Sequence, residues 1–507
     1  MTSLDAAPKQ PSNSSTGETF AALDLGSNSF HLLVAREQNG TIQVVDKHRE
    51  MTRLAAGLEA NGFLSQTCID LSLASLRRIG QRLRGIPPQN VRIVGTNALR
   101  QAANRDAFIS QAEAILNHNI EIISGSEEGR LIYAAVAQTI ESNEKHKLVI
   151  DVGGGSTEFI LGNRFEPQMT ESIHIGCISM SERWFHGGML TANRMDKAIQ
   201  DSRRELEVID QNYRAHGWDV AIGTSGTVIA IQNAIANFSP EGINKQTLKE
   251  LSQRLICFGH VDQIDPNWCA SRRAPTLPGG IAILRGIFSS FKLDALEVST
   301  GALREGLLLE LVGRAHNEDI RENSIQDLLP RFHIDEAHAA RVAATALTLF
   351  DQAFPNLNSD LAAERQLLRW AALLHELGMN ISHIAYHKHG AYLLEHLDMP
   401  GFSLTEQTQL GWLVRSHRRR VQVGALMPHN RSLNHLCVLL RLAVMFKRNR
   451  ADDALPKLRL AVRDQACELS IDRDWLNGHP LTRMDLEQEA QYLAEVGLEL
   501  TVSDTAI

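Results

Sequence analysis

Two segments of this chain repeat one order of residues: an apolar run, an aspartate, a turn of glycines and hydroxyls, and a second apolar run. The first lies in residues 20–34 around Asp24, and the second in residues 148–161 around Asp151. Each predicts two strands joined by a tight turn, because glycine permits sharp turns and the flanking runs are apolar. Closely spaced backbone N–H groups in such a turn fit phosphate oxygens. The duplication favours a phosphate site over an ordinary hairpin at both turns.

Carboxylates accompany both turns. Asp24 and Asp151 end the first strand of each pair and are expected to face each other, and Glu158 lies in the strand after the second turn. Such oxygen ligands hold a hard divalent cation directly or through water. A glycine-rich hairpin with solvated acids is the plain alternative, which the duplication disfavours. The chain has neither a P-loop nor a dinucleotide-binding glycine pattern.

Six motifs follow in an order typical of one family. They lie at residues 24–29, 95–100, 123–130, 151–158, 223–227 and 301–306. In these motifs the chain resembles the exopolyphosphatase and guanosine pentaphosphate phosphohydrolase (Ppx/GppA) family, strongly over residues 20–312. Residues 369–378 and the tail resemble the longer exopolyphosphatase members. The resemblance implies a duplicated ribonuclease-H-like fold of the actin, Hsp70 and sugar kinase type, followed by an all-α HD-like domain and a small α+β domain.

The expected organisation has five parts: a disordered leader (1–19), a first lobe (20–134), a second lobe (135–313), an all-helical HD-like domain (314–450) and a C-terminal α+β domain (451–507). Apolar runs predict strands at residues 91–94, 120–123, 221–222, 296–298, 458–462 and 468–471. Helical periodicity covers residues 339–350 and dominates residues 325–448, and another helix is expected at 486–494.

The resemblance assigns the catalytic base to Glu128, which opens a helix after the turn at residues 124–126. Its neighbour Glu127 is explained by a capping box with Ser124. Glu128 would deprotonate water for in-line attack on a terminal phosphorus. Mg²⁺, or Mn²⁺, would lie among Asp24, Asp151 and Glu158. The expected phosphate-binding residues are Gly26, Ser27, Asn28, Ser29, Thr96, Asn97, Arg100, Gly153, Gly154, Gly155, Ser156, Thr157 and Gly226.

Two of these groups have simpler explanations. Thr96, Asn97 and Arg100 would also suit a helix cap with a surface arginine, although a guanidinium binds phosphate oxygens in a bidentate manner. The turn that contains Gly226 would also suit an ordinary connection.

Residues 408–450 contain no Asp or Glu but nine Lys or Arg. This basic run predicts a polyanion track, and a solvated helix face or a dimer contact is the alternative. An acidic lipid surface would suit it as well. Nucleic acid is not expected, because aromatic residues make up only 5% of the chain. The predicted track includes Arg415, Arg418, Arg419 and Arg420.

His375 and Glu376 occupy the place of the His-Asp pair of metal-dependent HD phosphohydrolases. Clustered histidine and carboxylate ligands bind transition metals. The longer acid and the altered spacing nevertheless favour a structural region without metal. The histidines that lie near this pair in the sequence are His338, His383, His387, His389 and His417.

Composition is compatible with a cytoplasmic protein: six scattered cysteines show no Cys-x-x-Cys spacing, and no apolar run approaches a membrane span. We expect a Mg²⁺-dependent exopolyphosphatase that releases orthophosphate processively from inorganic polyphosphate. The alternative within the family is a 5′-phosphohydrolase that converts guanosine pentaphosphate (pppGpp) to ppGpp. The long C-terminal half and the basic run favour the polymer. A binding module without turnover is a third hypothesis, disfavoured because all four acids are present. The resemblance also implies a homodimer.

Overall fold

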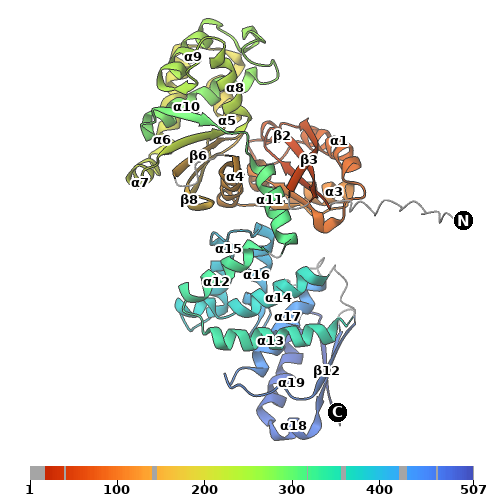
Figure 1. Cartoon of the computed structure of the whole chain (residues 1–507). Coiled ribbons are helices and arrows are strands. Elements are labelled where there is room, and N and C mark those ends of the chain that lie inside the picture. Colours follow the sequence, from red (N-terminus) through yellow and green to blue (C-terminus); the bar gives the residue numbers. More distant parts are fainter. Residues whose placement is uncertain are drawn as a thin grey trace, which may run out of the picture. The chain divides into compact units, whose positions relative to one another are not determined.

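The computed structural model describes residues 18–38, 41–139, 145–316, 318–355, 361–421, 431–463 and 466–505 (Figure 1). The chain divides into two compact units between Glu318 and Asp319. The expected leader lies almost wholly outside the described residues, and the first strand begins at Thr19.

The first unit contains two sheets with the same plan. In each, three antiparallel strands continue into parallel ones, in the orders β3-β2-β1-β4-β5 and β8-β7-β6-β9-β11-β10, and the edge strand β10 of the second sheet pairs antiparallel with β11. The duplication predicted from the two aspartate turns is therefore present, and the four strands expected in this unit are confirmed. The bounds are β1 (Thr19–Leu25), β2 (Ser29–Gln38), β3 (Thr41–Met51), β4 (Val91–Gly95), β5 (Glu121–Ile122), β6 (His146–Val152), β7 (Thr157–Asn163), β8 (Glu166–Ile173), β9 (Val220–Thr224), β10 (Ile243–Asn244) and β11 (Ala295–Val298).

Helices α4 (Gly125–Thr139) and α11 (Leu303–Ala315) pack on each other and share one hydrophobic core with strands of both sheets. Leu131 of α4 and Leu307 of α11 meet Phe20, Val149 and other buried strand residues in that core. The expected lobe boundary after residue 134 falls inside α4, so this helix belongs to both lobes. Burial of these apolar faces fixes the position of α4, at whose N-terminus Glu128 lies.

The remaining helices cover the lobes. In the second lobe, the apolar helix α10 is almost entirely buried among α5, α6, α8 and α9, as Figure 1 shows in yellow and green. The bounds are α1 (Gln66–Leu83), α2 (Asn97–Gln101), α3 (Arg105–Leu116), α5 (Cys177–Trp184), α6 (Ala192–Leu206), α7 (Asp210–His216), α8 (Ser225–Ala236), α9 (Lys245–Cys257) and α10 (Leu277–Phe291).

The second unit combines eight α-helices with a three-stranded sheet over its described residues. The predicted helix at residues 339–350 and the predicted strands at 458–462 and 468–471 are confirmed, and the helix expected at 486–494 is longer. Helices and strands share one hydrophobic core. The HD-like assignment stays a prediction. The bounds are α12 (Ile320–Arg331), α13 (Glu336–Ala353), α14 (Ala362–Leu374), α15 (Tyr386–His396), α16 (Leu404–Ser416), α17 (Arg431–Phe446), β12 (Leu458–Arg463), β13 (Ala466–Asp472), α18 (Arg473–Gly478), α19 (Pro480–Ala494) and β14 (Glu499–Thr505).

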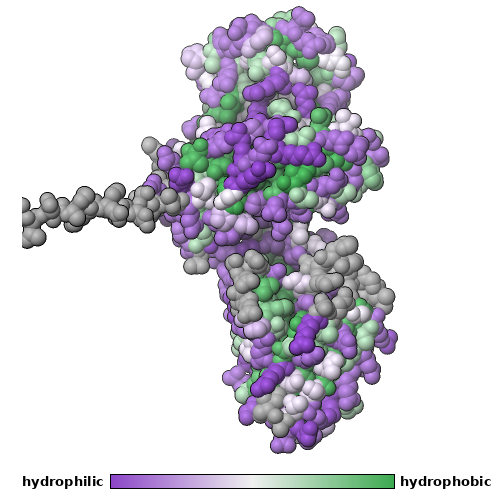
Figure 2. All heavy atoms as spheres, turned by 90° about the vertical axis from the view of Figure 1, so that its right-hand side faces the viewer, coloured by the Kyte–Doolittle hydropathy of each residue, from purple (hydrophilic) through white to green (hydrophobic). Residues whose placement is uncertain are grey.

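The face of the molecule drawn in Figure 2 carries many hydrophilic side chains, with smaller hydrophobic areas between them. Among the described residues, no helix combines the length and the apolar character that crossing a bilayer requires.

Candidate active site

The two glycine turns of the first unit approach each other at their backbones. A Cβ atom added to Gly154 would lie 3.2 Å from the Cβ of Ser27, and one added to Gly155 would lie 2.6 Å from Oδ1 of Asn97. Such an approach leaves no room for larger residues. Both turns line one cleft of about 690 Å³. The two segments that the sequence pairs are thus brought to the same site.

Three carboxylates line this cleft: Asp24 at the end of β1, Asp151 at the end of β6, and Glu128 on α4. Burial, and then the charge of Glu128, raise the pKa of Asp24 well above its ordinary range. The same two causes raise the pKa of Asp151 to about 7. Oδ1 of Asp24 is buried without a hydrogen-bond partner. Burial and repulsion among these carboxylates therefore disfavour the ionised forms of Asp24 and Asp151.

Glu158 pairs directly with Asp151 across the β6–β7 hairpin. Its side chain is almost completely buried and accepts a hydrogen bond of 2.8 Å from the Ser172 hydroxyl. Burial and the carboxylates of Glu128 and Asp151 raise its pKa. Glu158 lies outside the set of residues that line the cleft. Glu158 therefore lies beside Asp151 and does not line the cleft, and its role as a metal ligand stays a prediction.

Arg100, predicted to bind phosphate, instead contacts the predicted base. Its Nη1 donates to Oε2 of Glu128 and to the carbonyl of Ile123, each at 2.9 Å. Its Nη2 is buried and has no hydrogen-bond partner. Arg100 therefore fixes the orientation of Glu128, and a direct contact with phosphate stays a prediction.

Behind Glu128, α4 is anchored by buried ion pairs. Both carboxylate oxygens of Glu127 accept hydrogen bonds of 2.7 Å from Arg130. Arg130 also contacts Glu310 of α11, and Glu310 accepts a 2.7 Å hydrogen bond from the fully buried Arg92 of β4. The Glu127 amide donates to the Ser124 hydroxyl at 3.1 Å, as the predicted cap requires. These contacts hold α4 against the first sheet and α11.

Ser29 belongs to a chain of polar contacts at the cleft wall. Its Oγ accepts from Nε2 of His31 at 2.8 Å and from Nε of Arg49 at 3.2 Å. Nδ1 of His31 accepts from Arg304 at 3.2 Å, which assigns the ring hydrogen to Nε2. Burial and the Arg304 charge lower the pKa of His31 to about 3, so the ring is neutral. With both acceptor positions of Ser29 used, its own hydrogen is left to donate into the cleft.

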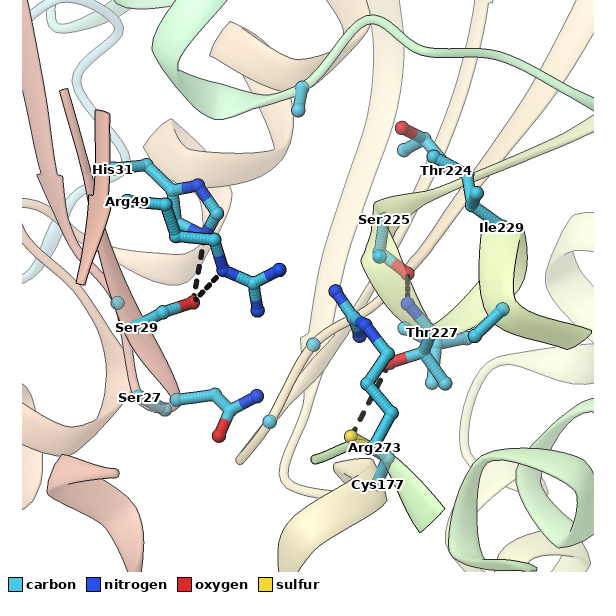
Figure 3. Close-up of a pocket in the computed structure, with 18 of the residues that line it drawn as sticks. Ser27, Ser29, His31, Arg49, Cys177, Thr224, Ser225, Thr227, Ile229 and Arg273 are labelled. Carbon is cyan, nitrogen blue, oxygen red and sulfur yellow. Dashed lines mark hydrogen bonds between the residues drawn. The ribbon is translucent and has the colours of Figure 1, made fainter. Parts of the chain in front are cut away.

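Four arginines line the cleft and form a cationic cluster: Arg49, Arg272, Arg273 and Arg304. Burial, with the charges of Arg273, Arg272 and Arg304, lowers the pKa of Arg49 to about 10. Arg49 and Arg273 extend from opposite walls toward the same space (Figure 3). Guanidinium groups held together against their repulsion form a site for a polyanion.

Gly226, another predicted phosphate residue, makes room for this cluster. A Cβ atom added there would lie 2.1 Å from Nη2 of Arg273. Gly226 lies in the first turn of α8, where Ser225 adopts a φ of 96° and its hydroxyl accepts from the Thr227 amide at 3.1 Å. The absence of a side chain at Gly226 therefore leaves the space that the Arg273 guanidinium occupies.

The other predicted phosphate residues divide into two groups. Thr157 and Gly155 do not line the cleft. The side chain of Thr157 is fully buried and donates to the Ile175 carbonyl at 2.6 Å, and the Asn97 side chain lies against Gly155. Those that line the cleft are Gly26, Ser27, Asn28, Ser29, Thr96, Asn97, Gly153, Gly154, Ser156 and Gly226. Sequence reasoning missed the cationic cluster, His31, Lys47 and Cys177. Of the four arginines in the cationic cluster, only Arg304 belongs to one of the six sequence motifs, the one at residues 301–306.

In the second unit, acids from distant positions compensate much of the basic run. Arg420 pairs with Glu495 at 3.3 Å, Arg448 pairs with Asp485 at 2.7 Å, and the buried Arg441 pairs with Glu489. Arg418 stacks over the Tyr386 ring at 4.6 Å. Arg415 is half-buried, Arg419 is exposed, and residues 422–430 lie outside the described residues. The polyanion track stays a prediction, and these ion pairs leave fewer unpaired positive charges to bind a polyanion.

Two α/β lobes of one plan carry a cleft lined with buried carboxylates and clustered arginines, a setting that suits the binding of phosphate groups. The chain belongs to the Ppx/GppA phosphatase family: the family model matches residues 33–315, and the model for domain III of Ppx/GppA phosphatases matches residues 320–490.

Relatives of similar length include proteins named guanosine-5′-triphosphate,3′-diphosphate pyrophosphatase. The one from Aeromonas hydrophila is 37% identical over 483 residues, which cover 94% of this chain and 97% of the relative. The one from Pseudoalteromonas translucida is 36% identical over 488 residues, 96% of this chain and 98% of the relative. A crystal structure of an exopolyphosphatase from Cytophaga hutchinsonii shares the fold, with a TM-score of 0.53 and 23% identity over 58% of this chain and 98% of that one.

Proposed function

We propose that this protein removes the terminal 5′ phosphate of guanosine pentaphosphate (pppGpp) to give ppGpp and orthophosphate. The observation that carries the proposal is the similarity, over nearly the whole of both chains, to relatives named for that nucleotide. The sequence-based preference for polyphosphate rested on the long C-terminal half. Because those relatives match nearly the whole of this chain, the presence of the long C-terminal half does not distinguish a polyphosphate hydrolase from a pppGpp hydrolase.

The chemistry of the cleft supports a substrate with two anionic groups. The glycine turns and the carboxylates fit a terminal phosphate with a cation, and the cationic cluster supplies guanidinium groups for further phosphates. A nucleotide with a 5′ triphosphate and a 3′ diphosphate offers both groups on one compact molecule. We place its 3′ diphosphate at Arg49 and Arg273.

Hydrolysis would proceed by in-line attack of water on the γ-phosphorus. Glu128 accepts the proton of that water, while Arg100 and the Ile123 carbonyl fix the position of its carboxylate. The bond between the γ-phosphorus and the bridging oxygen breaks, and the β-phosphate leaves with the electron pair. The Ser29 hydroxyl and the glycine-turn amides donate to the phosphoryl oxygens as charge spreads over them.

A divalent cation fits the cleft acids, because Asp24 has a buried oxygen without a partner and repulsion raises the pKa of Asp24 and Asp151. Among the residues that the structure describes, these acids are not gathered closely enough to enclose an ion alone, so water would complete the ligand set. Mg²⁺ held there would neutralise charge on the phosphate oxygens. Manganese as the ion, a homodimer, a cytoplasmic location and a membrane-surface contact stay predictions.

Inorganic polyphosphate is the second candidate substrate. The exposed Arg419 and Arg420 favour it, because a long polyanion gains affinity from charges beyond the cleft. The ion pair between Arg420 and Glu495 weakens that argument.

The test compares phosphate release from pppGpp, GTP and long-chain polyphosphate at equal Mg²⁺ concentration. Glu128→Gln should lower phosphate release from every substrate by roughly 10²- to 10⁴-fold. Arg273→Met should raise KM for pppGpp more than for GTP, which lacks the 3′ diphosphate, and Arg77→Met on the exposed face of α1 is the matched control. Faster release from polyphosphate than from pppGpp would replace the proposal with the second candidate.

A further inference from the structure

A compact cluster of potential metal ligands lies in the second unit, in residues that the proposed hydrolysis does not use. His338, His375 and Glu376 are buried, and each offers one ligand atom within 4.8 Å of the others. Nε2 of His338 and Nε2 of His375 each lie 3.9 Å from Oε1 of Glu376. The sequence pattern favours a structural role for this region, but these distances describe a three-ligand arrangement.

The hydrogen bonds of His375 leave one nitrogen free to bind an ion. Its Nδ1 lies 2.7 Å from the Ala372 carbonyl, so the ring hydrogen is on Nδ1 and Nε2 carries a lone pair. That Nε2 is buried and has no hydrogen-bond partner. Metal-bound histidines are typically oriented by such a bond from the second nitrogen to a carbonyl. The unpaired buried Nε2 of His375 needs a reason, and a bound cation supplies one.

The distances agree with a small transition-metal ion. Ligand atoms about 2.1 Å from a tetrahedral Zn²⁺ are about 3.4 Å apart, so each of the two imidazole–carboxylate distances of 3.9 Å would have to contract by about half an ångström. Imidazole nitrogen with one carboxylate suits Zn²⁺, Co²⁺ or similar ions better than Mg²⁺. We propose that His338, His375 and Glu376 bind one divalent transition-metal ion, with water in the fourth position.

Arg450 competes for the same carboxylate. Its Nη2 lies 2.6 Å from Oε1 of Glu376, and its Nη1 lies 3.0 Å from Oδ2 of Asp335. The Arg450 side chain is 42% exposed, so it can turn toward Asp335 and solvent while the ion takes its place. Arg450 therefore lowers the affinity of the site for a cation without filling it.

The experiment uses the full chain, stripped with a chelator and titrated with Co²⁺ in excess Mg²⁺, which occupies oxygen-rich sites such as the cleft. We expect one tightly held Co²⁺ per chain by mass spectrometry, with intense visible absorption typical of four-coordination. Glu376→Gln and His375→Gln should each lose this ion, whereas His383→Gln, an exposed histidine of the same unit, should keep it. Arg450→Met should bind Co²⁺ on the order of tenfold more tightly, because a like charge is removed.

The thermal transition checks that each variant is folded. The proposal is refuted if the folded wild-type chain holds no Co²⁺, or if either folded glutamine variant keeps the ion and its absorption. It is also refuted if Arg450→Met leaves the affinity unchanged. The readouts are stoichiometry and spectrum, so the result does not depend on which phosphate compound the cleft hydrolyses.

Discussion

Asp151→Asn should stabilise the metal-free protein, and the gain should grow with pH. The Asp151 carboxyl is 8% exposed, and burial with the charge of Glu128 raises its pKa from 3.8 to about 7. In the unfolded chain this group ionises near pH 4, whereas in the folded chain it holds its proton until about pH 7. The unfolded state is therefore favoured increasingly as pH rises through this window.

The magnitude follows from the shift. About three pKa units, at about 1.4 kcal/mol each, amount to about 4 kcal/mol above pH 7, and to about 1.5 kcal/mol at pH 5. Asparagine has the same shape and no charge, so the variant escapes this cost. For a unit of this size, 4 kcal/mol corresponds to a rise of roughly 8 °C in Tm.

The assay is calorimetry in chelator at pH 5 and pH 8, with hydrogen exchange of β6 and β7 peptides to report on the first unit. Saturating Mg²⁺ should erase most of the difference, because the ion stabilises wild type and not the variant. Asp70→Asn on the exposed face of α1 is the control and should show no such pH dependence. A gain of equal size at both pH values, or no gain at pH 8, would refute the argument from carboxylate burial.

Three further predictions concern single side chains. Glu128→Gln should lower turnover by roughly 10²- to 10⁴-fold with little change in KM, measured by steady-state phosphate release. His31→Leu should lower turnover, and His31→Gln should restore part of it, because an amide can donate to Ser29; in a double-mutant cycle with Ser29→Ala the losses should not add. Gly176→Ala should destabilise the first unit by about 2–3 kcal/mol by calorimetry, since its Cβ would lie 2.1 Å from a turn carbonyl oxygen, whereas Gly478→Ala meets no atom within 4 Å.

The elements that sequence predicted well are those with local signals. The aspartate turns, the paired strands and the helices follow from glycine placement and apolar periodicity over a few residues. The pairing of Asp151 with Glu158 follows from the hairpin itself, since a turn of only four residues joins the two strands.

The contacts that sequence could not predict join distant positions. Arg49 on β3 and Arg273 before α10 meet only because the two lobes fold around α4 and α11. The contact of Arg100 with Glu128 also joins distant positions, since one nitrogen of Arg100 donates both to the Ile123 carbonyl and to the Glu128 carboxylate. The acids that compensate the basic run, such as Glu489, lie far along the chain from it.

The buried ion pairs behind α4 constrain how this protein can diverge. Loss of the guanidinium of Arg92 or of Arg130 would break one of the buried ion pairs of Glu310, which Arg314 also contacts at 2.7 Å, and breaking a buried ion pair costs up to about 3–5 kcal/mol. Replacement of all these charged residues by apolar ones carries no such cost. Each single substitution on the way, however, breaks a buried ion pair and gives a less stable protein. Over evolutionary time these positions should therefore change together or not at all, although none of them touches the substrate.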